Sequence, residues 1–133
     1  MSDPVGELID ALTPTFLEKN VYIGRTPLTS LERVFGGQVF AQAMRAAQNT
    51  VDKTRQVHSQ HGYFIRPGDP KLPIIYEVNR VRDGRSFSTR SVNAKQEDKI
   101  IFSCLLSLSI SSGNSNFLKN PNNGFGSSIQ SLL

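Results

Sequence analysis

Two adjacent glycines, Gly36 and Gly37, stand where a helical pattern begins. Glycine is a poor helix former, so its presence there needs a reason. A tight turn into the helix is one reason. A chemical reason is that a helix start without Cβ atoms can lie close to neighbouring structure, where its unpaired N–H groups and partial positive charge face a ligand. The residues alone leave both interpretations open.

The chain has two histidines, His58 and His61, and one cysteine, Cys104. Side chains three positions apart in a strand point to opposite faces, so these histidines are not expected to bind one metal ion together. A neutral imidazole can deprotonate an attacking water near neutral pH, whereas a histidine without a partner also suits a structural hydrogen bond. Cys104 lies in the apolar run "IIFSCLLSLSI", which predicts a small buried hydrophobe rather than a nucleophile.

The composition indicates one soluble, intracellular domain. At 133 residues the chain can bury a core, and its single cysteine excludes an internal disulfide or a zinc site of several thiolates. The acidic start "MSDPVGELID" is unlike a secretory signal, and the longest apolar run is too short to span a bilayer. The net charge of +4 comes from dispersed arginines without the aromatic pattern of an RNA-binding sheet, so no nucleic-acid partner is expected.

A long helix that begins at Gly36 must position these residues. Its polar stripe, Gln38, Gln42, Arg45 and Asn49, follows helical spacing, while nearly all other positions are apolar. Only this narrow stripe is expected to face water. A helix that is apolar over most of its circumference has to be wrapped by other structure.

Strand-forming runs supply the wrapping. "TFLEKNVYIGR" predicts one strand, preceded by a short amphipathic helix over residues 4–12. Four further runs, separated by a Pro-Gly turn, by Asp83-Gly84 and by Glu97-Asp98, predict an antiparallel meander. The sequence therefore predicts an α+β domain over residues 1–110, with a curved sheet around one helix. Residues 111–133, rich in Ser, Asn and Gly, predict a disordered tail or linker.

Three segments resemble the N-terminal half of the type II acyl-CoA thioesterases, a family with bacterial and eukaryotic peroxisomal members. The segments are "RVFGGQVFAQAMRAA", "VHSQHGYFIRPGDP" and "PIIYEVNRVRDGRSFSTRSVNAKQEDKIIF", and the resemblance extends from about Leu8 to Leu108. It implies the hotdog fold, in which a long helix lies inside a curved antiparallel sheet, in agreement with the pattern above. It also implies hydrolysis of fatty acyl-CoA to a free fatty acid and CoA, with no metal or other cofactor.

The resemblance gives roles to two parts of the chain. In a thioesterase the helix start at Gly36, Gly37 and Gln38 is well placed to polarise the thioester carbonyl and to stabilise the oxyanion that forms when water attacks. His58, the histidine of "VHS", takes a catalytic or site-forming role. The water-activating Asp, Thr or Ser, and Gln of these thioesterases belong to a second hotdog, and no residue of this chain matches them.

Two arginines flank the predicted Asp83-Gly84 turn. Guanidinium groups bind phosphate well, so Arg82 and Arg85 are candidates for the phosphates of CoA. They are equally compatible with a solvated hairpin tip that has no ligand.

The sheet edges predict association. The runs "SFSTRSVNA" and "IIFSCLLSLSI" contain little charge or proline to protect an edge. The chain is therefore expected to pair with itself or with a second hotdog, to form a cleft between the two, and to have little hydrolytic activity alone. An inactive hotdog that binds acyl chains or serves as an oligomerisation domain is the alternative. The resemblance implies a peroxisomal location for a eukaryotic protein and a cytoplasmic one for a bacterial protein.

Overall fold

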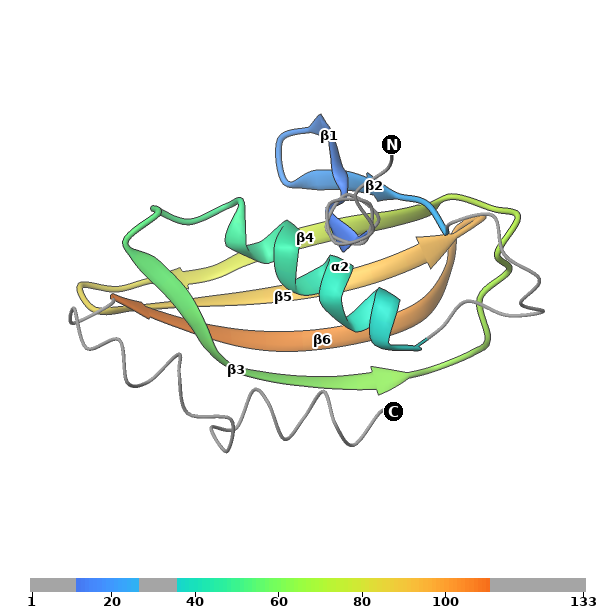
Figure 1. Ribbon diagram of the computed structural model, residues 1–133. Helices are drawn as coiled ribbons and strands as arrows, with labels where there is room; N and C mark the ends of the chain where they lie inside the picture. The colour runs from blue at the N-terminus through green and yellow to red at the C-terminus, as the bar shows by residue number, and fades with distance from the viewer. Residues whose placement is uncertain (1–11, 27–35, 111–133) are drawn as a thin grey trace, which may run out of the picture.

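A computed structural model describes residues 12–26 and 36–110 of the chain (Figure 1). The helix predicted over residues 4–12, apart from its last residue, and the tail predicted over 111–133 lie outside the described residues. The described elements are β1 (Thr15–Glu18), β2 (Val21–Gly24), α2 (Gly36–Gln48), β3 (Arg55–Phe64), β4 (Ile74–Asp83), β5 (Phe87–Gln96) and β6 (Lys99–Ile110).

The six strands form one antiparallel sheet in the order β1-β2-β4-β5-β6-β3. Strands β4, β5 and β6 form the predicted meander, but β3 does not belong to it in the predicted way. After Phe64 the chain leaves the β3 edge and continues in a strand that is not its neighbour, so that β3 pairs with β6 and β4 pairs with β2. The connection from Ile65 to Pro73 is long enough to make this crossing, whereas the tight turns later in the chain join neighbours.

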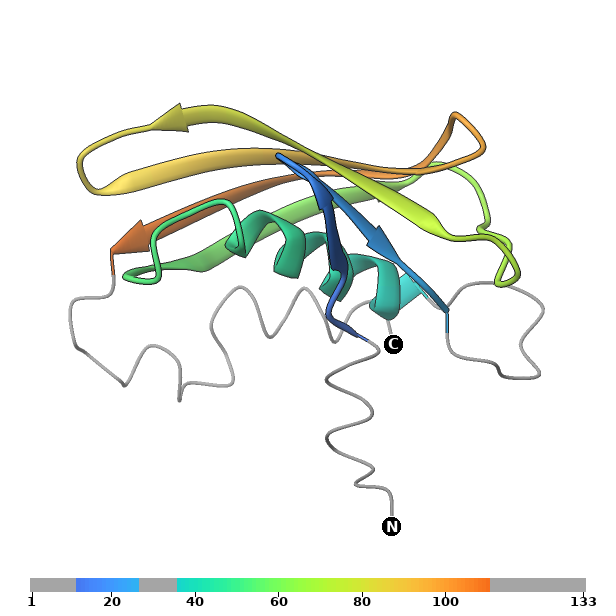
Figure 2. The same cartoon turned by 90° about the horizontal axis from the view of Figure 1, so that it is seen from above.

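The sheet lies along one side of α2 and curves over it, as the view from above shows (Figure 2). This confirms the predicted α+β arrangement with a hotdog-like topology. Alanines at positions 43, 46 and 47 of the helix have no exposed surface, which allows the backbone of α2 to approach the strands closely. The rest of the core comes mainly from inward-facing side chains of β4, β5 and β6: Ile74, Tyr76, Val78, Val92, Ala94, Phe102, Leu106 and Leu108.

The predicted water-facing stripe of α2 is only half correct. Arg45 and Asn49 are exposed, but Gln38 and Gln42 are buried. The Gln42 side chain accepts a hydrogen bond of 2.5 Å from the Tyr76 hydroxyl and donates one to the Arg25 carbonyl. A buried amide is tolerated when its polar atoms find partners, and helical spacing cannot reveal partners on distant strands.

Tight turns define the ends of the sheet. The single strand predicted in "TFLEKNVYIGR" is two strands, because Asn20 adopts a left-handed conformation (φ 65°) and reverses the chain. The predicted turn at Glu97-Asp98 is confirmed, and both residues have positive φ (50° and 66°), as a two-residue hairpin requires. At Asp83-Gly84 the predicted hairpin is confirmed, and the Gly84 N–H donates to the Phe87 carbonyl at 2.7 Å.

The sheet edges differ from the prediction. Strands β5 and β6, which correspond to "SFSTRSVNA" and "IIFSCLLSLSI", are interior strands with a neighbour on each side. Among the strands that the structure describes, the edges are β1, which is short, and β3, which is long and pairs only with β6. Any pairing with another sheet through a long strand therefore has to use β3.

Candidate active site

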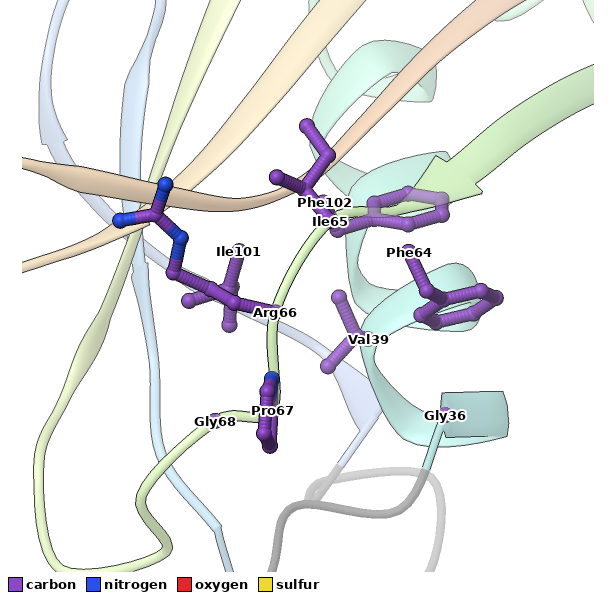
Figure 3. Close-up of a pocket in the computed structure, with 9 residues that line it drawn as sticks. All are labelled: Gly36, Val39, Phe64, Ile65, Arg66, Pro67, Gly68, Ile101 and Phe102. Carbon is purple, nitrogen blue, oxygen red and sulfur yellow. The ribbon is translucent and has the colours of Figure 1, made fainter.

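A pocket of about 390 Å³ opens at the amino end of α2 (Figure 3). The helix contributes Gly36 and Val39 to its wall, and β6 contributes Ile101 and Phe102. The remaining wall is the end of β3 and the segment that follows it, from Phe64 to Gly68. The Pro-Gly turn that the sequence marked only as a turn is thus part of the pocket.

At Gly36 the helix start lies close to its neighbour. A Cβ atom on Gly36 would lie 3.3 Å from the Phe64 ring, tighter than an ordinary contact, so the close approach is confirmed at this position. The first N–H groups of a helix have no partner within the helix and carry its partial positive charge. The pocket therefore combines apolar walls with an electropositive helix start.

The segment from Ile65 to Leu72 is fixed to the sheet by hydrogen bonds. The backbone N–H groups of Ile65 and Arg66 both donate to the Ile101 carbonyl, at 2.9 and 3.3 Å. Gln96, which is buried, accepts from the Asp69 N–H at 2.8 Å and donates to the Asp69 and Leu72 carbonyls. This wall of the pocket is therefore held in place before any ligand binds.

Arg66 is the one ionisable side chain among the residues that line the pocket, and its guanidinium extends away from Gly36 (Figure 3). None of the described lining residues is a histidine, carboxylate, serine, threonine or cysteine. The pocket can seat an apolar chain and polarise a carbonyl, but it contains no side chain able to accept a proton from water.

The structure places His58 away from this pocket. A β-bulge at His58 interrupts the register between Val57 and Ser59, and the imidazole Nε2 lies 2.8 Å from the Ser107 hydroxyl. Ser107 alternates with the buried Leu106 and Leu108, so it lies on the outer face of the sheet, opposite α2. A single chain therefore does not bring His58 and the helix start together.

The same bulge overturns the expectation that the two histidines point to opposite faces. His61 pairs with the exposed Leu105 on the outer face, where His58 also lies. Within residues 12–26 and 36–110 there is still no group of three or more side chains of the kinds that hold a metal ion.

The other predicted site residues lie away from the pocket. The Gln38 side chain turns from the pocket and donates to the Thr26 hydroxyl at 3.1 Å, so only its backbone belongs to the helix start. Arg82 and Arg85 are exposed at the β4–β5 hairpin, beside the beginning of β3: the Arg55 guanidinium donates to the Arg85 carbonyl at 3.1 Å. Phe64, at the pocket, is the other end of β3, roughly 30 Å away along the strand.

The prediction for Cys104 is confirmed. The side chain is buried, and desolvation raises the pKa of its thiol to about 12, against a hydrogen bond from Gln60 that lowers it. Such a thiol remains protonated at neutral pH and is a poor nucleophile.

Sequence analysis missed the aromatic wall and the buried polar residues. Phe64 and Phe102 are ordinary strand residues in the sequence, and no local pattern shows that they meet at the helix start. Arg90 alternates with Val92 and Ala94 in β5, so its inward direction was a detectable signal, whereas the bulge after Val57 hides the inward direction of Gln60.

A helix held in a curved antiparallel sheet, with an apolar pocket at the helix start, defines a hotdog-like protein. Residues 25–111 match the acyl-CoA thioesterase N-terminal domain family, and the chain belongs to this family. The resemblance stated from the sequence motifs is thereby confirmed.

Named relatives agree with this assignment. Human acyl-coenzyme A thioesterase 8 is 46% identical over 107 residues, which are 77% of this chain and 34% of the relative. Peroxisomal acyl-coenzyme A thioester hydrolase 1 of Saccharomyces cerevisiae is 36% identical over 75% of this chain and 28% of its own length. The crystal structure of an acyl-CoA thioesterase II from Mycobacterium marinum has a TM-score of 0.71 at 42% identity, covering 80% of this chain and 39% of that chain. The chain thus spans about a third of the length of the curated relatives.

Proposed function

We propose that this chain forms the N-terminal hotdog of an acyl-CoA thioesterase, which hydrolyses fatty acyl-CoA to a free fatty acid and CoA. The observation that carries the proposal is the pocket at Gly36, where a helix start meets apolar walls. Family membership and the names of the relatives support the same reaction. Within the described residues no helix is long and apolar enough to cross a membrane.

In this proposal the pocket binds the acyl group and orients the thioester. The walls made by Val39, Ile101 and Phe102 take up the acyl chain, and the N–H groups at Gly36, Gly37 and Gln38 polarise the carbonyl oxygen. The helix dipole stabilises the oxyanion that develops when water attacks. Because the pocket holds no base, the group that activates the water has to come from outside this hotdog.

The second hotdog would reach the site through the free edge of β3. An antiparallel partner strand would place its own first residues beside Phe64, and with them the partner's β4–β5 hairpin, since Arg55 holds that hairpin near the start of β3. This arrangement would bring a partner's Arg82 and Arg85, or the equivalent side chains of a different hotdog, toward the pocket. The CoA phosphates would then bind between the two halves.

His58 takes no step in the proposed reaction of one chain, because it faces the other side of the sheet. A role for it requires contact between the outer face and another domain. The location proposed for a eukaryotic protein is the peroxisome, which is supported by the name of the yeast relative.

The lack of a base favours one second candidate, a hotdog that binds acyl-CoA without hydrolysing it. The test measures binding of a thioether analogue of acyl-CoA by calorimetry and hydrolysis by release of the CoA thiol. We expect binding, with turnover by the chain alone below about 1 per second. Gly36→Val should weaken binding at least about tenfold because its side chain would press on Phe64. Asn49 is exposed just beyond the far end of α2, so Asn49→Ala should leave binding unchanged.

Two results would contradict these proposals. Absence of binding at millimolar analogue would reject both the thioesterase and the binding-only hotdog. Binding that persists without turnover after a second hotdog has been paired to β3 would reject the thioesterase and leave the binding-only protein.

A further inference from the structure

Two aromatic rings, Phe64 and Phe102, line the pocket, and a third ring, Phe40, packs against Phe102. The Phe102 ring lies 4.7 Å from Phe64 and 6.1 Å from Phe40, measured between ring centroids. Phe40 and Phe102 are buried, whereas Phe64 is 45% exposed at the pocket mouth. Phe102 is thus the ring that closes the inner end.

Gly62 determines where the Phe102 ring can lie. Phe102 is opposite Phe64 in the register of β3 and β6, and Gly62 is the next inward-facing residue of β3, opposite Cys104. A Cβ atom on Gly62 would lie 2.5 Å from Cζ of Phe102 and 2.6 Å from its Cε1. The ring therefore occupies the space that the side chain of any other residue would take at position 62.

The position of the Phe102 ring affects the pocket. The ring leans from the pocket end of the sheet toward the helix middle, and behind it lie Gln60 and Cys104, which are in contact at 3.5 Å. If position 62 carried a methyl group, Phe102 would have to move. Phe40 is 4% exposed and packed beside it, so the open space for that movement is the pocket itself.

We propose that Gly62 and Phe102 together set the depth of the acyl pocket and so limit the length of acyl chain that this hotdog accepts. The proposal rests on the proposed function, because it names what determines the acyl substrate at that same site. A chain that ends above the Phe102 ring is seated fully, and each further methylene has to remain outside. Each methylene that the pocket can seat should strengthen binding about fourfold.

Substitutions at the two positions should change the depth of the pocket in opposite directions. Gly62→Ala pushes the ring toward the mouth and shortens the pocket. Phe102→Ala removes the ring and opens the pocket toward Cys104 and Gln60. Phe102→Leu, which keeps an apolar side chain but shortens it, should give an intermediate depth. Phe64, which also lines the pocket, would lie 3.3 Å from a Cβ atom on Gly36, a looser contact than the 2.5 Å between Gly62 and Phe102.

The experiment measures the dissociation constants of thioether analogues from butanoyl- to octadecanoyl-CoA, by calorimetry on the full chain. For the parent we expect the constant to fall about fourfold per methylene and then to level off at one length. Gly62→Ala should level off at a shorter chain and Phe102→Ala at a longer one. Gly24→Ala is the matched control, because its Cβ would press on Gln42 at 2.5 Å, away from the pocket, and should leave that length unchanged.

The possible failures are distinguishable. If the parent binds no analogue, the proposed function fails and this inference fails with it. If the parent binds, and its dissociation constant levels off at the same acyl-chain length as those of Gly62→Ala and Phe102→Ala, only the role of Gly62 and Phe102 is refuted. Should either variant fail to fold, Phe102→Trp and Phe102→Leu replace them as the shortening and lengthening variants. A shift in the Gly24→Ala control equal to that of Gly62→Ala would also refute the pair.

Discussion

Two glutamines inside the core show how differently a buried amide can be accommodated. Gln42 has no exposed surface, and both ends of its amide have partners, Tyr76 and Arg25. Gln60 is 2% exposed and donates to the Phe40 carbonyl at 3.2 Å, but its Oε1 atom has no partner. Burial also raises the pKa of the Tyr76 hydroxyl well above its usual value, so that this group stays a donor to Gln42.

Substitution of these glutamines by methionine should therefore have unequal effects. Gln60→Met removes an unpartnered oxygen from the core along with the hydrogen bonds to the Phe40 carbonyl and the Cys104 thiol, and we expect the free energy of unfolding to stay within about 0.5 kcal/mol or to rise by about 1 kcal/mol. Gln42→Met leaves the Tyr76 hydroxyl buried without its acceptor and should cost about 1–3 kcal/mol. Urea unfolding measures both. Equal losses would show that Gln60 has an acceptor role that the structure does not contain.

At the scale of elements, a buried arginine joins the end of α2 to the β4–β5 hairpin. Arg90 is 1% exposed, and its Nε donates to the Thr50 hydroxyl, just beyond the helix, at 2.7 Å. Its Nη2 forms a 2.8 Å ion pair with Asp83, which also accepts a hydrogen bond from Ser88 at the same distance. Those hydrogen bonds, first from Ser88 and then from Arg90, lower the pKa of the Asp83 carboxyl.

Asp83→Asn should lower the free energy of unfolding at neutral pH by about 1–2 kcal/mol, since Arg90 keeps its carbonyl partners but loses its counter-charge. Because folding lowers the pKa of Asp83, its contribution is fully present above the unfolded value of 3.8 and is lost as the pH falls through the folded value. The difference between parent and variant should therefore shrink below about pH 4. Urea unfolding across pH measures this.

The matched control for charge is Asp98→Asn, at a turn position with φ 66° that asparagine accepts readily. It should leave stability nearly unchanged at all pH values. A difference between the parent and Asp83→Asn that stays constant from pH 7 to pH 3 would contradict the assigned role of the carboxylate.

Element boundaries were largely predictable because each depends on local chemistry. Helix α2 begins at Gly36 as its apolar spacing predicts, and β6 coincides with the run "KIIFSCLLSLSI". The neighbour of β3 was not predictable in this way. Alternation of apolar residues tells which face a side chain occupies but not which strand lies beside it. The crossing after Phe64 depends on α2, whose apolar surface has to be covered by strands on both sides.

At the scale of the whole molecule, the candidate site also depends on which strands are neighbours, which the sequence pattern does not tell. The glycine pair could be placed at a helix start from sequence, but the contact of the Phe102 ring, on β6, with Gly62, on β3, could not. His58 likewise lies on the outer face through a bulge that has no clear sequence signal. Contacts between distant strands fix these features, so one strand's pattern does not contain them.

The free edge of β3 leads to the prediction about assembly. Within residues 12–26 and 36–110 only β6 pairs with β3, and the outward side chains of the edge include Ser59 and the exposed His61. We expect the chain to self-associate through this edge. The double variant Ser59→Asp with His61→Asp should weaken that association about tenfold, because an antiparallel partner would bring like charges together at about 0.2–1 kcal/mol per pair. Sedimentation velocity over a range of concentrations measures the association constant.

The matched control distinguishes the edge from the outer face of the sheet. Ser103→Asp with Leu105→Asp adds the same charge to the same face, on the adjacent interior strand β6, opposite Tyr63 and His61. If association uses the edge, the association constant of this control should stay within about twofold of the parent's, since interior strands have no free backbone groups to offer a partner. Association through the outer face instead weakens both double variants alike, because the charges then lie at the centre of the contact. A parent that sediments as a monomer at tens of micromolar would refute self-association, and the partner of β3 would then have to be a hotdog of different sequence.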